Sequence, residues 1–290
     1  MKKLIAICIL LLTVSCASPQ PLEPTPEAAR EVTREATLEA SRVATPEATR
    51  ETTPEPTITP APPVALTWEH DPETLIIQAS SPGGGSASNA ALINSLFHAQ
   101  VWGNGRIIWT TWGEDYQRQV WQGQLSEVEM MALLETFADK DFFHMKARYE
   151  PTENVLDGGT SRLSVYLLST AKEVSEYVSG APPEFHDLYD LLISGAGVEG
   201  TAYLPQSGHL TARKIEPQDG LDYIDAPVWD AAALGLDLHD AAGIWVEGDA
   251  LIQAWEVVNQ NSAFPIVVQG DDYFELRLRL PQLSIMAPPQ

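Results

Sequence analysis

The stretch that decides the fold is Leu96-Phe97-His98-Ala99-Gln100-Val101-Trp102-Gly103-Asn104-Gly105-Arg106-Ile107-Ile108-Trp109-Thr110-Thr111-Trp112. Two runs rich in β-branched and aromatic residues flank Asn104 and Gly105. This dipeptide favours a two-residue turn because both of its positions accept a positive φ. We therefore predict a β-hairpin, with one strand over 96–102 and the other over 106–112.

A two-residue turn also fixes which side chains share a face of the hairpin. Trp102 and Trp109 then lie on the same face, with Gln100 and His98 beside them. Tryptophans mixed with hydrogen-bonding side chains can stack on a sugar ring or on a peptide while satisfying its polar edges. These four residues form the candidate binding face. The alternative is that a helix, predicted over 126–137, covers this face and makes it core.

Strands and helices alternate irregularly along the rest of the chain. A strand is expected over 117–122, and Ser126 with Glu129 has the spacing of a capping box ahead of an apolar-periodic helix that ends at Phe137. Further strands are expected over 162–168, 173–178, 211–215, 244–246, 266–269 and 273–280, and further helices over 185–193 and 250–258, the last one capped by Asp249. Without a regular strand-helix-strand rhythm, the pattern predicts an α+β fold with mainly antiparallel sheets and a few packed helices.

Composition divides the chain into a stalk and a folded part. Residues 17–64 are rich in Pro, Thr, Glu, Ala and Arg, contain a loose internal repeat and have no aromatic residue. Such a segment cannot bury enough apolar surface to offset chain entropy, so we predict a disordered stalk over 16–64. The folded part is expected to be one large domain or two small ones, an α+β domain over 65–197 and a smaller α+β domain over 198–290.

The first sixteen residues have the composition of an export signal. Two lysines precede an apolar run over 4–12 that is too short to span a bilayer. The following Leu12-Thr13-Val14-Ser15-Cys16 resembles the lipobox of bacterial lipoproteins, with Thr13 where leucine is usual. The resemblance implies a signal peptide over 1–15 and a fatty-acylated Cys16 that attaches the mature chain to a membrane. Ordinary secretion without a lipid is the alternative.

Cysteine content and charge exclude several classes of protein. Cys8 lies in the predicted signal peptide and Cys16 would carry the lipid, so the mature chain would have no disulfide, no thiolate metal site and no catalytic cysteine. The formal net charge is −23, and most of it falls in the folded part. Nucleic acid and anionic lipid surfaces are therefore poor partners.

Motifs for catalysis and for metal binding are mostly missing. The chain has no H-E-x-x-H, no G-x-S-x-G elbow and no phosphate loop. Ser169-Thr170-Ala171-Lys172 matches the S-x-x-K of penicillin-recognising enzymes, but it falls between two predicted strands and no K-T-G follows, so a polar hairpin turn explains it. The acidic stretch from Asp219 to Asp249 lacks calcium-loop spacing and favours a solvated face. We predict no catalytic residues, no metal site and no cofactor.

The folded part, from the hairpin to Phe143 and again in the closing strand over 273–281, resembles uncharacterised exported lipoprotein domains, and this resemblance implies no known activity. The anchor and the missing motifs predict an extracytoplasmic, lipid-anchored binding or interaction module without catalysis, on the cell membrane or the outer membrane. The expected ligand is extracellular or periplasmic, a carbohydrate or a peptide. Two alternatives stay open: a hydrolase of envelope polymers with dispersed carboxylates, and a structural envelope protein.

Overall fold

The computed structural model describes residues 64–81, 88–113, 117–216 and 226–289. The contacts of the chain separate Met1–Thr59 from a second compact unit, Pro60–Gln290. The predicted signal peptide, Cys16 and all but the last residue of the predicted stalk lie outside the described residues.

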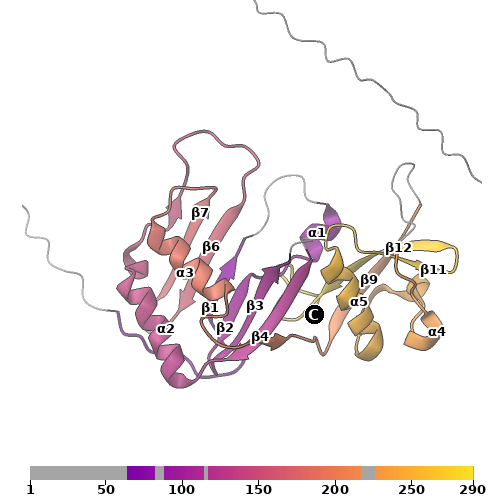
Figure 1. Cartoon of the computed structure of the whole chain (residues 1–290), viewed down its shortest axis with the longest axis horizontal. Helices are drawn as coiled ribbons and strands as arrows, with labels where there is room; N and C mark the ends of the chain where they lie inside the picture. Colours follow the sequence, from indigo (N-terminus) through magenta and orange to yellow (C-terminus); the bar gives the residue numbers. More distant parts are fainter. Residues whose placement is uncertain (1–63, 82–87, 114–116, 217–225, 290) are drawn as a thin grey trace, which may run out of the picture. The chain divides into compact units, whose positions relative to one another are not determined.

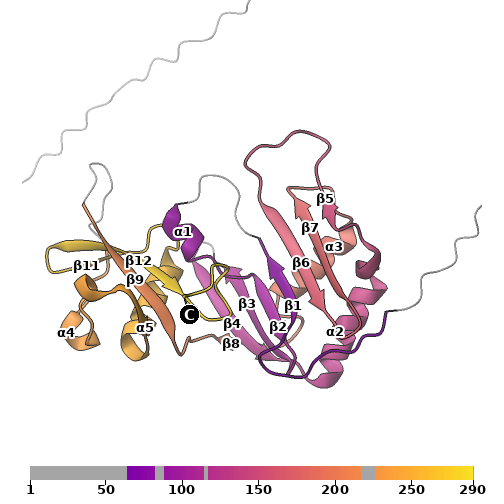
Figure 2. The same ribbon diagram turned by 180° about the vertical axis from the view of Figure 1, so that it is seen from behind.

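An eight-stranded sheet forms the larger part of this unit (Figures 1 and 2). Its strand order is β5-β7-β6-β1-β2-β3-β4-β8. Neighbouring strands are antiparallel, except for the parallel pair β5 and β7. The strands are β1 (Leu75–Ser80), β2 (Ala99–Trp102), β3 (Arg106–Trp112), β4 (Arg118–Gln124), β5 (Arg148–Tyr149), β6 (Thr160–Tyr166), β7 (Ala171–Tyr177) and β8 (Thr201–Ala202).

Two helices cover one face of this sheet: α2 (Glu127–Asp139) and α3 (Pro183–Ile193). They lie in front of the sheet in Figure 1 and behind it in Figure 2. The predicted capping box of α2 is present: the backbone N–H of Glu129 donates to the Ser126 hydroxyl at 3.3 Å, and the Ser126 N–H donates to the Glu129 carboxylate at 2.7 Å. The apolar faces of both helices contribute to a first hydrophobic core, with Ala99, Val101, Ile107 and Trp109 of the sheet among its members.

A second, four-stranded antiparallel sheet has the order β10-β9-β12-β11. Its strands are β9 (Gly208–Ile215), β10 (Ala242–Val246), β11 (Ile266–Gln269) and β12 (Asp272–Arg279), and the helices of this part are α4 (Ala231–Leu234) and α5 (Gly248–Gln260). A short helix, α1 (Asn89–Ile93), contacts β12. These elements enclose a second hydrophobic core, which also contains Trp102, Ile108 and Val120 of the large sheet. Strands β2 to β4 therefore have a hydrophobic core on each face.

The hairpin of β2 and β3 has a different turn from the predicted one. Ala99 pairs with Trp109 and Val101 with Ile107, so the loop has three residues rather than two. Gly105 adopts a φ of +83° and donates its N–H to the Trp102 carbonyl at 2.8 Å. A slip of one residue reverses the faces of one strand relative to the other. The prediction that Trp102 and Trp109 share a face is therefore wrong.

The α+β class with mainly antiparallel sheets is confirmed, and three local predictions are corrected. Strand β1, in the interior of the large sheet, was not predicted. Strand β9 begins at Gly208, three residues before the predicted start. Glu247 is the N-cap of α5, so Asp249 lies in the first helical turn instead of capping it. No described helix combines the length and the apolar character needed to cross a membrane.

The chain after α3 stays in contact with the large sheet. A Cβ added to Gly195 or to Gly200 would come within 2.7 Å or 2.4 Å of the Trp109 indole, so the absence of side chains lets this segment cover the ring. Strand β8 then pairs with β4. Residues after 197 thus contribute to both sheets. The predicted division into one domain over 65–197 and another over 198–290 stays a prediction.

Candidate functional site

The four residues of the predicted binding face do not form one exposed surface. Trp102 and Trp109 are 1% and 6% exposed and belong to different cores, and Gln100 is 3% exposed. The platform prediction is wrong for two reasons: the three-residue turn separates the indoles, and a hydrophobic core covers each face of the hairpin. The alternative of a covered face holds, although helix α2 is only part of the cover.

His98 lies elsewhere, at a cavity of about 210 Å³ that it lines with Thr110, Trp112 and Arg118 among others. Its Nδ1 is 2.8 Å from the hydroxyl oxygen of Tyr189. Burial lowers the pKa of His98 and raises the pKa of Tyr189. Both side chains are therefore neutral at pH 7, and they form a hydrogen-bonded pair between α3 and the end of β2.

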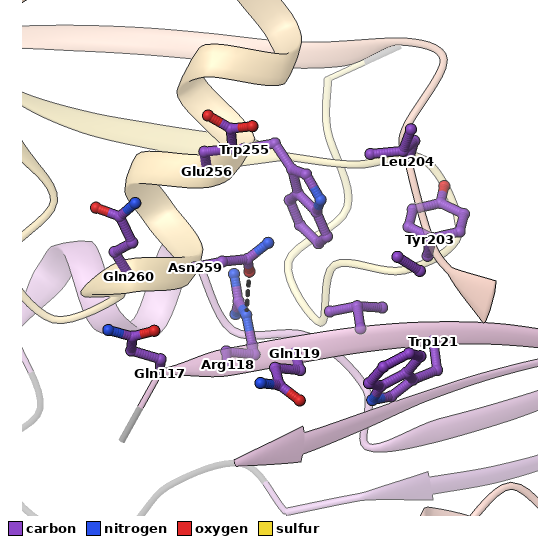
Figure 3. Close-up of a pocket in the computed structure, with 12 residues that line it drawn as sticks. Gln117, Arg118, Gln119, Trp121, Tyr203, Leu204, Trp255, Glu256, Asn259 and Gln260 are labelled. Atoms are coloured by element: carbon purple, nitrogen blue, oxygen red, sulfur yellow. Dashed lines mark hydrogen bonds between the residues drawn. The ribbon is translucent and has the colours of Figure 1, made fainter. Parts of the chain in front are cut away.

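A cavity of about 390 Å³ lies between β4 and α5 (Figure 3). This volume is within the range of small-ligand sites. Its apolar and aromatic lining comes from Val120, Trp121, Ala202, Tyr203, Leu204 and Trp255, and its polar lining comes from Gln117, Arg118, Gln119, Glu256, Asn259 and Gln260. An aromatic surface with a few converging polar groups is typical of a binding site for an organic molecule.

Arg118 is the cation of this cavity, and it is 5% exposed. Figure 3 shows its side chain pointing from β4 toward Asn259 on α5. Its Nε donates to the Asn259 side-chain oxygen at 2.7 Å, and its Nη1 donates to the Asn94 carbonyl at 2.6 Å. The guanidinium carbon is 5.6 Å from the centre of the Trp255 ring. Its Nη2 is buried and has no hydrogen-bond partner.

The residues that hold Arg118 are themselves fixed by the fold. Asn94, the C-cap of α1, is fully buried, accepts a hydrogen bond from the Leu278 N–H at 2.8 Å and donates to the Leu276 carbonyl at 3.2 Å. Asn259 lies in the last turn of α5. Residues of α1 and α5 thus set the position of the guanidinium, which leaves it little freedom to reach another partner.

The charge of Arg118 is uncompensated within the described part of the chain. No ion pair between described residues includes it. Burial lowers the pKa of Arg118 to about 9, so the side chain is still protonated at neutral pH. A buried donor without an acceptor costs about 1–3 kcal/mol, and more when it is charged. An anion bound at Nη2 would remove this cost.

The described residues of the other sequence motifs form hydrogen bonds within the fold. The Ser169 hydroxyl donates to the Ala65 carbonyl at 2.8 Å, while the Lys172 ammonium donates to the Met145 carbonyl, so the two side chains of the S-x-x-K motif bind different partners. In the acidic stretch, Asp230 caps α4 and Asp237 accepts hydrogen bonds from His239 and Gln269. Among the described residues, no group of three potential metal ligands was found. The part of this stretch over 219–225 lies outside them.

A family model described as a domain of unknown function (DUF6438) matches residues 95–194, about a third of the chain. The chain is similar to that domain from β2 to α3. The matched range includes Arg118 and the β4 side of the cavity but not β8 or α5. Neither a curated protein nor a solved structure matches this chain.

Arg118 was not among the predicted site residues. The sequence carries only a weak signal for it, an arginine two residues before Val120 within a predicted strand. In a strand, residues two apart share a face, so Arg118 lies on the same side as a core residue. That pattern indicates an inward-facing charge, but only the fold brings Asn94, Asn259 and Trp255 to it.

Proposed function

We propose that this protein is a non-catalytic binding module whose site is the cavity between β4 and α5. The ligand would be a small organic acid or a segment ending in a carboxylate, with an aromatic or apolar part beside it. One observation carries the proposal: the buried Nη2 of Arg118 has no partner. A carboxylate oxygen is the acceptor that a guanidinium prefers, and an oxygen hydrogen-bonded to Nη2 would neutralise the buried charge.

The rest of the cavity favours the same class of ligand. Tyr203 and Trp255 supply aromatic surface, with ring centres 6.1 Å apart in an edge-to-face arrangement. Gln260 adds a side-chain amide on the α5 side that can donate to a second carboxylate oxygen or accept from a ligand N–H. Since Nε and Nη1 of Arg118 are already occupied, the guanidinium would bind the ligand through one donor.

The test is a titration with indole-3-propionate and benzoate, each compared with its uncharged amide, followed by tryptophan fluorescence and by calorimetry. We expect the acids to bind at least about tenfold more tightly than the amides, which corresponds to one charge-assisted hydrogen bond. Arg118→Gln should remove this difference. Arg148→Gln removes an exposed arginine paired with Glu150 and is the matched control, which should bind like the wild type. Equal binding of acids by Arg118→Gln would overturn the proposal.

The pH dependence of binding provides a second readout. The pKa of Arg118 is about 9 without ligand, and a bound carboxylate would raise it. Affinity should therefore be constant from about pH 6 to 8 and should fall as the pH rises above about 9, where the free protein loses the charge. Weaker binding of the acid at pH 10 than at pH 7, in protein still folded by circular dichroism, is the expected result.

We also propose that a lipid on Cys16 tethers the module to the extracytoplasmic side of a membrane. The support is the lipobox-like Leu12-Thr13-Val14-Ser15-Cys16 after a basic and apolar leader. Cys16→Ala should move the protein to the soluble fraction and abolish labelling with a fatty-acid analogue, because both cleavage and acylation need the thiol. Membrane association unchanged by Cys16→Ala would contradict the tether and leave the proposed cavity untouched.

A further inference from the structure

The cavity follows the edge of strand β4. Five successive residues line it, from Gln117 to Trp121. Successive side chains of a strand point to opposite faces of the sheet. Since residues of both faces line it, the cavity reaches the edge of β4, which is free of β8 at the Arg118 end. Figure 3 agrees: Arg118 points toward α5, whereas Gln119 and Trp121 lie on the other side of the strand.

The backbone of β4 has unused hydrogen-bonding groups at this edge. The Val120 carbonyl accepts from the Tyr203 N–H at 2.9 Å, so the backbone groups of Val120 point away from β3. Alternate residues of an antiparallel strand point the same way, which places the N–H and C=O of Arg118 on this open side as well. No described residue outside the strand ladders bonds to them.

Strand β8 ends before it reaches Arg118. Its register pairs Ala202 with Trp121, so Pro205 would stand opposite Arg118 if the strand continued. Proline has no N–H to donate and disfavours sheet pairing. Strand β8 therefore ends before Arg118. The cavity lies where the next pair of backbone hydrogen bonds between β8 and β4 would form.

We propose that the ligand of this cavity is the carboxyl-terminal end of an extended peptide, which pairs with the edge of β4 at Arg118 and places its terminal carboxylate on Nη2. This inference rests on the proposed function and specifies its ligand. Strand addition supplies main-chain hydrogen bonds that are independent of sequence, and a pocket beside the strand selects a side chain. Tyr203 and Trp255 form that pocket and favour an aromatic or large apolar last residue.

A peptide uses groups that a simple acid leaves unpaired. Indole-3-propionate can occupy Nη2 and the aromatic surface, but it has no peptide N–H and no peptide C=O to pair with the Arg118 backbone. A chain end offers these groups together with the carboxylate. An amidated or internal peptide segment lacks the negative charge and would leave Nη2 without an anionic partner.

The experiment titrates the folded protein with N-acetyl-Ala-Ala-Phe carrying a free carboxylate. The comparison peptides are its C-terminal amide and two versions N-methylated at either Phe or the preceding Ala. We expect the amide to bind about tenfold more weakly, since it loses a charge-assisted hydrogen bond. One of the two methylated peptides should also bind about tenfold more weakly than the unmethylated peptide. The other should lose less affinity, because only alternate residues of the peptide face the edge of β4.

Amide hydrogen exchange distinguishes strand pairing from other modes of binding. The Arg118 N–H faces the open edge and should become protected when the peptide binds, by about tenfold or more at a saturating concentration. The Gln119 N–H faces β3 and serves as the internal control, with little change. Indole-3-propionate should protect neither amide.

Each outcome has a separate meaning. Binding of the small acids with the expected dependence on Arg118, combined with no binding of the free-carboxylate peptide, overturns the peptide inference and leaves the proposed function standing. Peptide binding without protection of the Arg118 amide also overturns edge pairing. Loss of all binding by both acids and peptides overturns the proposed function itself.

Discussion

The two faces of the hairpin and of its neighbour β4 differ in what they bury. The face toward α2 and α3 is apolar and well packed, as Val101, Ile107 and Trp109 illustrate. The opposite face combines apolar residues with Gln100, Arg106 and Arg118, and a buried side-chain atom of each of these three lacks a hydrogen-bond partner. One face therefore contributes mainly stability, whereas the other retains polar groups that cost stability.

This difference is the basis on which the proposed site was chosen, since no motif indicates it. Buried polar atoms without partners are uncommon, and each one needs an explanation such as strain, an unseen partner or a functional role. Gln100 lies deep in the sheet and Arg106 stacks on Trp102 with its guanidinium carbon 4.0 Å from the ring centre. Arg118 differs from both because it also lines an open cavity of about 390 Å³.

The largest expected effect comes from the helix-covered face. Trp109→Ala should lower the free energy of unfolding by about 3–5 kcal/mol, because truncation of a buried aromatic leaves a cavity beneath Gly195 and Gly200. Urea unfolding followed by circular dichroism measures it. Trp112→Ala, on the same strand but 51% exposed, is the control and should change stability by less than about 1 kcal/mol. Equal losses in the two variants would remove the contrast between core and surface.

A smaller loss of stability is expected where the chain after α3 covers Trp109. Gly200→Ala would place a Cβ 2.4 Å from the indole, so we expect a loss of about 1–3 kcal/mol from overpacking. In Gly113→Ala the nearest atom is 3.7 Å away, which is an ordinary contact, and stability should stay within about 0.5 kcal/mol of the wild type. A normal unfolding curve for Gly200→Ala would show that this segment is not packed on the ring.

Removal of the buried charge should affect stability less than either core change. Arg118→Met loses two hydrogen bonds but also removes an uncompensated guanidinium, and these effects oppose each other. We expect the free energy of unfolding to change by less than about 2 kcal/mol, while binding of aromatic acids is lost. Destabilisation as large as that of Trp109→Ala would mean that Arg118 is a structural residue and that the two faces do not differ in role.

The smallest expected effect is a contrast between two histidines. Hydrogen bonds that the ring of the exposed His239 donates to the carboxylates of Asp272 and Asp237 raise its pKa above 6.5, and burial lowers the pKa of His98 below 6.5. The contribution of His239 to the free energy of unfolding is complete below pH 6.5 and is lost as the pH rises through its raised pKa. The contribution of His98 is complete above pH 6.5 and is lost as the pH falls through its lowered pKa. NMR titration should resolve both, and Asp272→Asn should lower only the pKa of His239.

The sequence predicted the parts of the fold that depend on local chemistry. The capping box at Ser126, the hairpin around Asn104 and Gly105, and most other strands and helices follow from periodicity and turn residues. The register of the hairpin did not follow. The segment Gly103-Asn104-Gly105 can form a two-residue or a three-residue turn, and the burial of Trp102 and Trp109 in separate cores accompanies the three-residue form.

What the sequence by itself determined is the α+β class, the contrast between the stalk-like composition and the folded part, and the absence of recognised catalytic motifs. What only the tertiary structure decided is the environment of Arg118, on which the proposed site rests. Arg118 is an ordinary strand residue in the sequence, and its partners Asn94 and Asn259 lie 24 and 141 residues away. The environment of a buried charge depends on long-range contacts, which hydrophobic periodicity does not encode, so its missing partner is visible only once the sheets and α5 have packed together.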